Sequence, residues 1–291
     1  MPNVVMPKFE YHMPENIQEV LALLDKYGCD AKIIAGGTDV LPKLKGGVMA
    51  PAHIISLREV KELRFIDYDC HDGLRFGANV KLRELENNPI VKSKYKALYM
   101  GCHSIASTQI RNIATLVGNV CNAVPSADSA PALLALSAKL KIVSSKGERI
   151  VPIEKFFTGV CKTVLSPNEL VTEVIVPEMG ANSGSYYFKY AVRRAMDLAL
   201  VGVAAKITVE NGICSDAKIA LGAVAITPKR APEAEKMLIG QHLTANLIEQ
   251  AARFASENEC SPISDIRASK EYRREMVYVL TRDAIKNSIV A

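Results

Sequence analysis

Two adjacent glycines, Gly36 and Gly37, directly follow a short apolar run and precede Thr38 and Asp39. Glycine tolerates positive φ and close approach of the backbone, so a turn of this kind can point several N–H groups at a diphosphate. The Thr38 hydroxyl could donate to a phosphate oxygen, and a helix beginning at Thr38 or Asp39 would add a favourable dipole end. A Gly-Gly turn after a strand is more often a plain turn, and the sequence matches neither GxGxxG nor GxxxxGK[ST]. The residues therefore indicate a candidate phosphate loop that needs support from elsewhere in the chain.

A second polar segment, residues 109–131, contains Gly118, three asparagines, two serines and Asp128. It is too long for an ordinary turn, and long ordered loops tend to be functional. Asp128 has two competing interpretations. It could cap the helix expected to start near Ser129, or it could accept hydrogen bonds from a ribose or a cofactor-bound water.

Composition limits the classes of function. The 291 residues are 49% hydrophobic, 23% charged and 6% aromatic, which favours a folded chain with a large core over a disordered one. The net charge of +5 is spread along the chain, so no nucleic-acid partner is expected. No apolar run approaches the roughly 20 residues that cross a bilayer. We therefore expect a cytoplasmic protein without a membrane partner.

The chain has seven cysteines and no CxxC pair, and we interpret them as reduced thiols that serve as small core residues. No metal site is predicted, and the absence of a triad or HExxH pattern leaves no catalytic residue to assign. The cysteines are Cys29, Cys70, Cys102, Cys121, Cys161, Cys214 and Cys260.

The spacing of apolar residues predicts an α+β first half. The glycine turn lies between an expected strand over residues 31–35 and a short helix over residues 40–45. An opening helix is expected over residues 14–27. Further strands are expected over residues 53–57, 63–68, 74–78, 139–143, 147–151 and 170–176, and further helices over 81–86, 91–107 and 129–137.

A stretch rich in Pro, Gly and Ser, residues 177–184, indicates a domain boundary. A small sheet followed by a group of helices is expected beyond it. The strands are expected over residues 185–192, 199–209 and 215–223, and the helices over residues 232–238, 245–257 and 270–288.

A resemblance to a known family rests on several spaced motifs taken together. Ala35-Gly36-Gly37-Thr38-Asp39, Gln109-Ile110-Arg111-Asn112 with residues 115–119, and Ser126-Ala127-Asp128 resemble the two FAD loops of molybdenum-hydroxylase flavoprotein subunits. Two later motifs follow in the family's order. They are Phe188-Lys189-Tyr190-Ala191 with Arg193, Met196 and Asp197, and Arg267-Ala268-Ser269-Lys270-Glu271-Tyr272-Arg273. The resemblance spans the whole chain and is greatest to the bacterial xanthine dehydrogenase branch.

The resemblance implies an α+β fold with a two-lobed FAD-binding domain over residues 1–178, with a small lobe over about 1–57 and a larger lobe over about 58–178. A C-terminal domain over residues 185–291 would hold a three-stranded sheet and helices.

The resemblance also implies roles for particular residues. Asp128 would hold the adenosine-diphosphate portion, Val171 would touch the cofactor, and Lys189 would approach the flavin ring. Without the family, Val171 would be interpreted as ordinary core and Lys189 as a solvated strand lysine. The first FAD loop would comprise Lys32, Ile33, Ile34, Ala35, Gly36, Gly37, Thr38, Asp39, Val40 and Leu41, and the second loop Thr115, Leu116, Val117, Gly118 and Asn119.

Two positions depart from the family pattern. Val117-Gly118 stands where the family commonly has two glycines, and a β-branched residue is confined mostly to negative φ, so the second loop is expected to sit slightly differently. Ile105 stands where eukaryotic relatives can offer an aromatic ring against the flavin, which puts stacking at this position in doubt.

The implied function is electron transfer through noncovalently bound FAD. Electrons would come from [2Fe-2S] clusters on a small partner subunit and pass to NAD+, and molybdopterin would lie on a large partner subunit that oxidises xanthine. A sister flavoprotein serving nicotinate, carbon monoxide, an aldehyde or an aromatic acyl-CoA is the alternative. The acyl-CoA version would carry an extra cluster-binding insertion with close cysteines, which this chain lacks. A flavin-free scaffold subunit is the alternative from another class.

Overall fold

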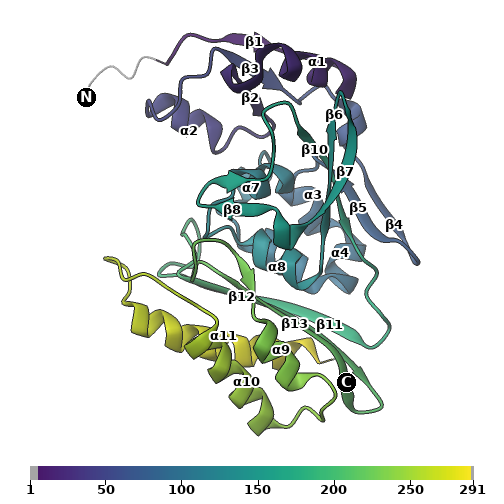
Figure 1. The fold of residues 1–291 in the computed structure, drawn as a ribbon, viewed down its shortest axis with the longest axis vertical. Coiled ribbons are helices and arrows are strands. Elements are labelled where there is room, and N and C mark those ends of the chain that lie inside the picture. Colours follow the sequence, from purple (N-terminus) through teal and green to yellow (C-terminus); the bar gives the residue numbers. More distant parts are fainter. Residues whose placement is uncertain (1–5, 290–291) are drawn as a thin grey trace.

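The computed structural model describes residues 6–289 and arranges them as a small N-terminal lobe, a middle part and a C-terminal sheet covered by helices (Figure 1). The α+β class expected from the sequence is confirmed. The outermost ends of the two predicted domains, residues 1–5 and 290–291, lie outside the described residues.

The N-terminal lobe is a parallel three-stranded sheet in the order β1-β3-β2. Helix α1 packs on it through Val20, Leu21 and Leu24, and its first turn is capped by the Asn16 side chain. The helix begins three residues later than predicted, and β1 was missed because three mostly exposed residues give no alternation to detect. The elements are β1 (Glu10–His12), α1 (Ile17–Tyr27), η1 (Gly28–Asp30), β2 (Ala31–Ile34), α2 (Val40–Lys45) and β3 (His53–Ser56).

The middle part is built on an antiparallel five-stranded sheet in the order β4-β5-β10-β6-β7. Its central strand, β10, is buried along nearly its whole length, which agrees with the Leu, Val and Ile residues on both sides of Thr172 and Glu173. The strand predicted over residues 63–68 starts later, because η2 (Lys61–Leu63) precedes it. The strands are β4 (Ile66–Asp69), β5 (Gly73–Gly77), β6 (Lys139–Ser144), β7 (Gly147–Pro152) and β10 (Leu170–Val176); η3 (Ile153–Lys155), β8 (Phe157–Gly159) and β9 (Lys162–Thr163) form the connection before β10.

Short helices cover this sheet. The single helix predicted over residues 91–107 is wrong, because the fully buried Tyr95 takes a non-helical backbone (φ −113°, ψ 57°) and divides it into two. The segment 109–131 also contains two helices that were not predicted, each begun by a hydroxyl cap, Ser107 and Thr115. The helices are α3 (Leu82–Asn87), α4 (Pro89–Lys94), α5 (Lys96–Ser104), α6 (Thr108–Arg111), α7 (Leu116–Asn122) and α8 (Ser129–Ala135).

The C-terminal part is an antiparallel sheet in the order β11-β12-β13-β14, with one short strand more than predicted. Helices α9, α10 and α11 cover its outer face, and α5 and α8 of the middle part pack on the other (Figure 1). Gly222 marks how closely the sheet meets α8, because a Cβ at that position would lie 2.5 Å from Pro131 Cγ. The elements are β11 (Ser183–Tyr190), β12 (Val201–Glu210), β13 (Ile213–Gly222), β14 (Lys229–Arg230), α9 (Pro232–Leu238), α10 (Ala245–Asn258) and α11 (Lys270–Ser288).

The interpretation of all seven cysteines as small core residues is only partly correct. Cys102, Cys214 and Cys260 are buried, and burial raises the pKa of the Cys214 thiol to about 11. The thiols of Cys29, Cys70 and Cys161 are exposed, because Cys29 lies in the short η1 and the other two lie in turns. Within residues 6–289, no helix is both long enough and apolar enough to span a bilayer.

Candidate cofactor site

The two predicted FAD loops meet at Gly36. A Cβ at this position would lie 2.7 Å from Ala114 Cα and would collide with the Ile113 carbonyl oxygen. Only glycine therefore allows the first loop to rest on the backbone that leads into Thr115 and the second loop. The Lys43 ammonium adds a hydrogen bond of 2.6 Å to Asn122 Oδ1, which joins α2 of the N-terminal lobe to the end of α7.

Backbone donors remain available where the loops meet. The N–H groups of Gly37, Thr38 and Asp39 have no acceptor among residues 6–289, and neither does that of Val117 in the first turn of α7. The left-handed backbone of Gly37 (φ +73°) turns the first loop at this point. Free N–H groups on two adjoining loops match the needs of a diphosphate.

Apolar surface borders these donors. Ile33, Ile34 and Ala35 are only half-buried, and Leu41 is exposed although it lies in α2, which buries only Leu44. A half-covered apolar wall beside unpaired donors is the arrangement found in pockets for cofactors with an apolar ring and a charged tail. The residues present therefore fit FAD. Lys32 and Asp39 are exposed and contribute no buried side chain to this wall.

The second loop is a helix start rather than an open loop. Thr115 caps α7, and its hydroxyl accepts a hydrogen bond from Gly118 N at 3.1 Å. Val117 lies in the first turn of that helix, and its side chain is buried. The helical backbone there has negative φ, which suits a β-branched residue, so valine fits where the family commonly has glycine. Gly118 is exposed and Asn119 is half-buried, with Asn119 Oδ1 accepting from the Ser129 hydroxyl at 2.6 Å.

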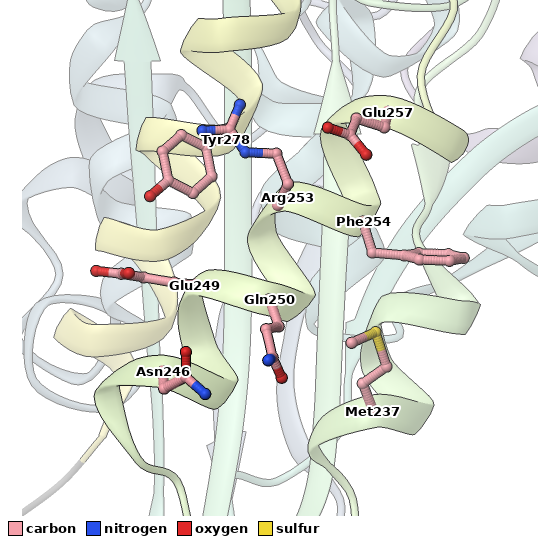
Figure 2. Close-up of a pocket in the computed structure, with 8 residues that line it drawn as sticks. All are labelled: Met237, Asn246, Glu249, Gln250, Arg253, Phe254, Glu257 and Tyr278. Carbon is pink, nitrogen blue, oxygen red and sulfur yellow. The ribbon is translucent and has the colours of Figure 1, made fainter.

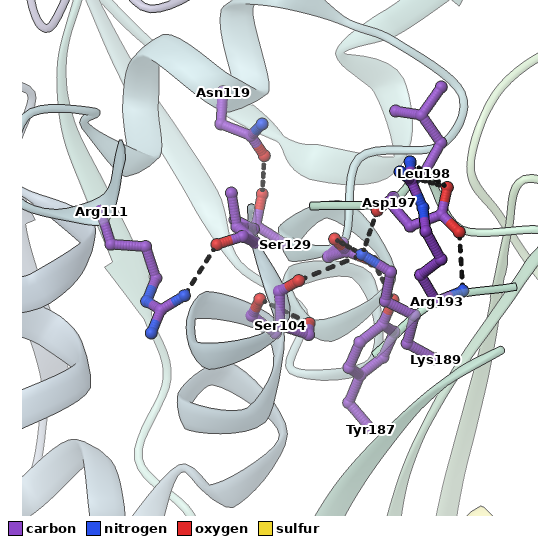
Figure 3. A network of polar contacts seen from close by, with 12 residues as sticks. Ser104, Arg111, Asn119, Ser129, Tyr187, Lys189, Arg193, Asp197 and Leu198 are labelled. Atoms are coloured by element: carbon purple, nitrogen blue, oxygen red, sulfur yellow. Dashed lines mark hydrogen bonds and ion pairs between the residues drawn. The ribbon is translucent and has the colours of Figure 1, made fainter. Parts of the chain in front are cut away.

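Asp128 is committed to other side chains. It stands at the cap position of α8 but makes no capping hydrogen bond, so the capping interpretation is wrong. Its carboxylate instead accepts from the Tyr187 hydroxyl and from Lys189 Nζ, both at 2.8 Å (Figure 3). Burial raises the pKa of Asp128, and the charge of Lys189 and both hydrogen bonds oppose that rise. Its contact with the adenosine diphosphate stays a prediction.

Lys189 is not a solvated strand lysine. Its side chain is 13% exposed, and its ammonium donates to Asp128 Oδ2, to Ser104 O at 3.1 Å and to Asp197 O at 2.8 Å (Figure 3). These three acceptors use all three of its N–H groups. Lys189 thereby connects β11 of the C-terminal part with the end of α5 and the start of α8.

Arg111 is a buried residue of this region whose role the sequence did not reveal. Its guanidinium donates to Ile105 O at 3.0 Å and to Glu86 Oε2 at 3.0 Å. With Lys189 on Ser104 O, two cations hold consecutive carbonyls at the end of α5, just before Ala106, which has φ +47°. The motif around Arg111 was visible in the sequence, but the burial of a charged side chain was not.

Val171 is the second residue of β10, and its side chain is 2% exposed. It belongs to the main hydrophobic core, next to a register shift between β10 and β6. A contact between Val171 and the cofactor stays a prediction. Ile105 is also nearly buried, at 9% exposure.

A surface hollow of about 410 Å³ is lined by residues of α9, α10 and α11 (Figure 2). No residue of either loop lines it. Arg253 crosses it, stacked 3.7 Å from the Tyr278 ring and paired with Glu275 at 2.9 Å. The hollow offers paired charges and none of the free backbone donors that distinguish the loops.

Comparison with known proteins decides the family. A family model described as the FAD binding domain in molybdopterin dehydrogenase matches residues 7–179, and one described as the CO dehydrogenase flavoprotein C-terminal domain matches residues 186–288. The chain belongs to the FAD-binding subunits of the molybdenum hydroxylases. It is 36% identical over 282 residues to the putative xanthine dehydrogenase FAD-binding subunit of Escherichia coli K12, covering 97% of this chain and 96% of that one.

Other members of the family serve different enzymes. The chain is 36% identical to the glyceraldehyde dehydrogenase medium chain of Sulfolobus acidocaldarius, covering 96% of this chain and 98% of that one. Its fold matches a chain of the carbon monoxide dehydrogenase from Hydrogenophaga pseudoflava with a TM-score of 0.93 at 32% identity, covering 98% of each chain. As an FAD-binding subunit, the chain is part of an oxidoreductase.

We predict that Gly37→Val weakens FAD binding by at least about tenfold, roughly 1.4 kcal/mol, and more than Gly47→Val does. Both glycines have positive φ, +73° and +67°, so both variants carry the same kind of backbone strain. At Gly37 a Cβ would press on Ile34 and Leu41 at 3.0 and 3.3 Å, whereas at Gly47 the space is open. Flavin absorbance per protein, measured in the supernatant after acid precipitation, gives the occupancy. Equal retention by the two variants would remove the first loop from the site.

A second prediction concerns Glu86, whose side chain is 4% exposed and forms an ion pair with Arg111. Burial alone would raise its pKa, but hydrogen bonds from His103, Arg111 and Arg83 outweigh burial and lower the pKa from 4.5 to about 2. A carboxyl group whose pKa is lower in the folded chain than in the unfolded chain stabilises the fold at pH values above the unfolded pKa. This stabilisation is lost as the pH falls from about 4.5 towards 2.

Between about pH 6 and about pH 3, the unfolding free energy should therefore fall by about 2 kcal/mol more in the parent than in Glu86→Gln. Urea unfolding at the two pH values measures this. Glu148→Gln, which removes a carboxylate that is 61% exposed, is the control and should follow the parent. A parent and a Glu86→Gln variant with the same pH dependence would show that the carboxylate does not stabilise this region.

Proposed function

We propose that this chain holds FAD noncovalently where its two loops meet and relays electrons from a partner's iron-sulphur clusters to NAD+. The contact of Gly36 with the backbone of Ile113 and Ala114 carries this proposal, because it brings together loops that both have unpaired N–H groups. Both loops would hold the diphosphate. Residues 1–178 and 185–291 would then serve as the cofactor-binding domain and the C-terminal domain.

Bound FAD supplies the ability to take up electrons singly and to release two as a hydride. The chain's own contribution is position and charge. Lys189 and Arg111 fix the turn from Ser104 to Ala106 from two sides, and the Met196 amide donates to Ala106 O at 3.3 Å from a third. We propose that this fixed turn supports the flavin ring, with Ile105 offering an aliphatic rather than an aromatic neighbour.

The proposed partners are a large subunit that carries the molybdenum cofactor and a small subunit that carries the [2Fe-2S] clusters. The cysteines support this division, since within residues 6–289 the exposed Cys29, Cys70 and Cys161 are far apart in sequence and none belongs to a group of close metal-binding side chains. Relatives named as medium chains and as a FAD-binding subunit also support a multi-subunit enzyme. We place the assembly in the cytoplasm.

Xanthine is the proposed substrate of the molybdenum subunit. Support comes from the motif around Lys189 and Asp197 and from 36% identity to a putative xanthine dehydrogenase subunit. The same identity to a glyceraldehyde dehydrogenase medium chain makes an aldehyde the second candidate. No residue of this chain need touch that substrate, because in this scheme only electrons reach the flavin.

The assembled enzyme provides the test of the relay. We expect xanthine to drive NAD+ reduction in the complex, followed as NADH absorbance, and we expect the reaction to stop when the flavin is removed. Glyceraldehyde, nicotinate and carbon monoxide are tested in parallel. Turnover with one of these compounds and not with xanthine would contradict xanthine as the substrate. Electron transfer to a dye but not to NAD+ would contradict NAD+ as the acceptor.

The last prediction of this section concerns the charge pair of Lys189 and Asp128. A positive charge near the flavin stabilises electrons placed on it, and a negative charge does the opposite. Lys189→Met should lower the two-electron midpoint potential of the bound flavin, and Asp128→Asn, the matched control, should raise it. Redox titration at equal FAD occupancy measures both.

Stability must be followed together with the potential, because removing Lys189 alone leaves a buried carboxylate unpaired at a cost of about 3–5 kcal/mol. The double variant Lys189→Met/Asp128→Asn removes the pair and should regain most of that loss. Potentials that match the parent in both single variants would show that Lys189 positions the turn and does not tune the cofactor.

A further inference from the structure

Glu10, His12 and His53 form a cluster on the N-terminal lobe that neither FAD loop uses. Glu10 and His12 are two residues apart on β1, so their side chains leave the same face of the strand. In the parallel pairing of β1 with β3, the backbone partner of Glu10 is His53. The register therefore brings one carboxylate and two imidazoles together from parts of the chain about 40 residues apart.

The distances within the cluster suit one metal ion. His12 Nε2 lies 3.1 Å from His53 Nδ1, and the Glu10 carboxylate oxygens lie 3.5 Å from His53 Nδ1 and 3.9 Å from His12 Nε2. A tetrahedral zinc ion with bonds of about 2.0–2.1 Å sets its ligand atoms roughly 3.3 Å apart. Both imidazoles already stand close to that spacing, and the Glu10 side chain, 63% exposed, can turn to complete it.

The surroundings hold the two imidazoles in place. The Tyr27 ring, at the end of α1, stacks on His53 with ring centroids 3.6 Å apart and planes inclined by 19°. Tyr27 also lies 5.2 Å from the His12 ring. The side chains of His12 and His53 are 13% and 18% exposed, so the pair is sheltered by protein on one side and reached by solvent from the side of Glu10. Ligands fixed in this way lose little freedom on binding.

We propose that Glu10, His12 and His53 bind a divalent transition-metal ion, Zn²⁺ in the first place, with solvent at the remaining position. Two histidines and one glutamate are a ligand set that zinc accepts with an open fourth position. Without metal, one imidazole N–H lies between His12 Nε2 and His53 Nδ1 as a hydrogen bond. Metal binding needs a lone pair on both atoms, so that proton moves to the other nitrogen of its ring and neither imidazole becomes charged.

The site would act on the lobe that carries the first FAD loop. A metal ion held by β1 and β3 adds a link between two strands that otherwise share only a three-residue pairing. Strand β3 also pairs with β2, from Ala31 to Ile34, and β2 leads directly into Gly36. Metal binding should therefore raise the thermal stability of the lobe by mass action, since the unfolded chain does not bring the three ligands together.

Tag-free, chelator-treated protein is titrated with Zn²⁺ in competition with a chromophoric chelator, with and without FAD. We expect one Zn²⁺ per chain in addition to any weaker sites, and a matching rise in melting temperature. His12→Gln/His53→Gln should lose this site, and Glu10→Gln should weaken it by at least about tenfold. His71→Ala, which removes an exposed histidine from a turn in the middle part, is the matched control and should bind as the parent does.

Co²⁺ gives an independent measurement, because its visible absorption reports whether the ion has nitrogen ligands in a low-coordinate site. A parent that binds Zn²⁺ and Co²⁺ no more tightly than the double histidine variant would overturn the proposal and leave only scattered surface sites. If the histidine variant fails to fold, Glu10→Gln decides the matter, since its exposed side chain is not needed for the core. Unchanged affinity and unchanged Co²⁺ absorption in Glu10→Gln would also overturn it.

Discussion

The close approach of Gly36 to the backbone of Ile113 and Ala114 is the constraint on which the rest of the structure depends. It requires a strand, β2, that ends at the border of its lobe, and a helix, α7, whose first turn faces that end. The unpaired backbone N–H groups at this contact come from both lobes. The hydrophobic cores determine where the two loops stand, and the missing side chain at Gly36 determines how near they come.

Buried charges also fix the position of the turn that ends α5. A buried ion pair gains little over packed apolar residues, because two charges must be taken out of water. The pairs of Lys189 with Asp128 and of Arg111 with Glu86 nevertheless lie side by side, and each cation also donates to a carbonyl at the end of α5. Such donors are directional, so they hold a turn in one place where apolar contacts would allow it to shift.

The sequence predicts most of the regular elements, because apolar periodicity and glycine turns are local signals. The strands of the five-stranded sheet and the C-terminal helices lie within a few residues of their expected places. The sequence fails to predict an element where tertiary contacts determine the backbone. At Tyr95, the apolar pattern predicts one continuous helix, but the buried Tyr95 interrupts it. The glycine loops could be proposed from residue types, but their contact could not, since the residues involved are far apart in the chain. The partners of Asp128 and the cluster around His53 depend on register and burial, which no local pattern encodes.

The bond between Lys189 and Asp128 has a consequence for the modularity of the chain. Asp128 stands at the start of α8 in the middle part, and Lys189 lies on β11 in the C-terminal part. Two separate family models cover these parts, as though they were independent modules. Cutting the chain between them would leave a carboxylate without its cation in one fragment and expose the apolar face of α8 at the same time. A C-terminal part taken from a relative would therefore have to match the rest of the chain. It would need a lysine at the strand position of Lys189 to pair with Asp128.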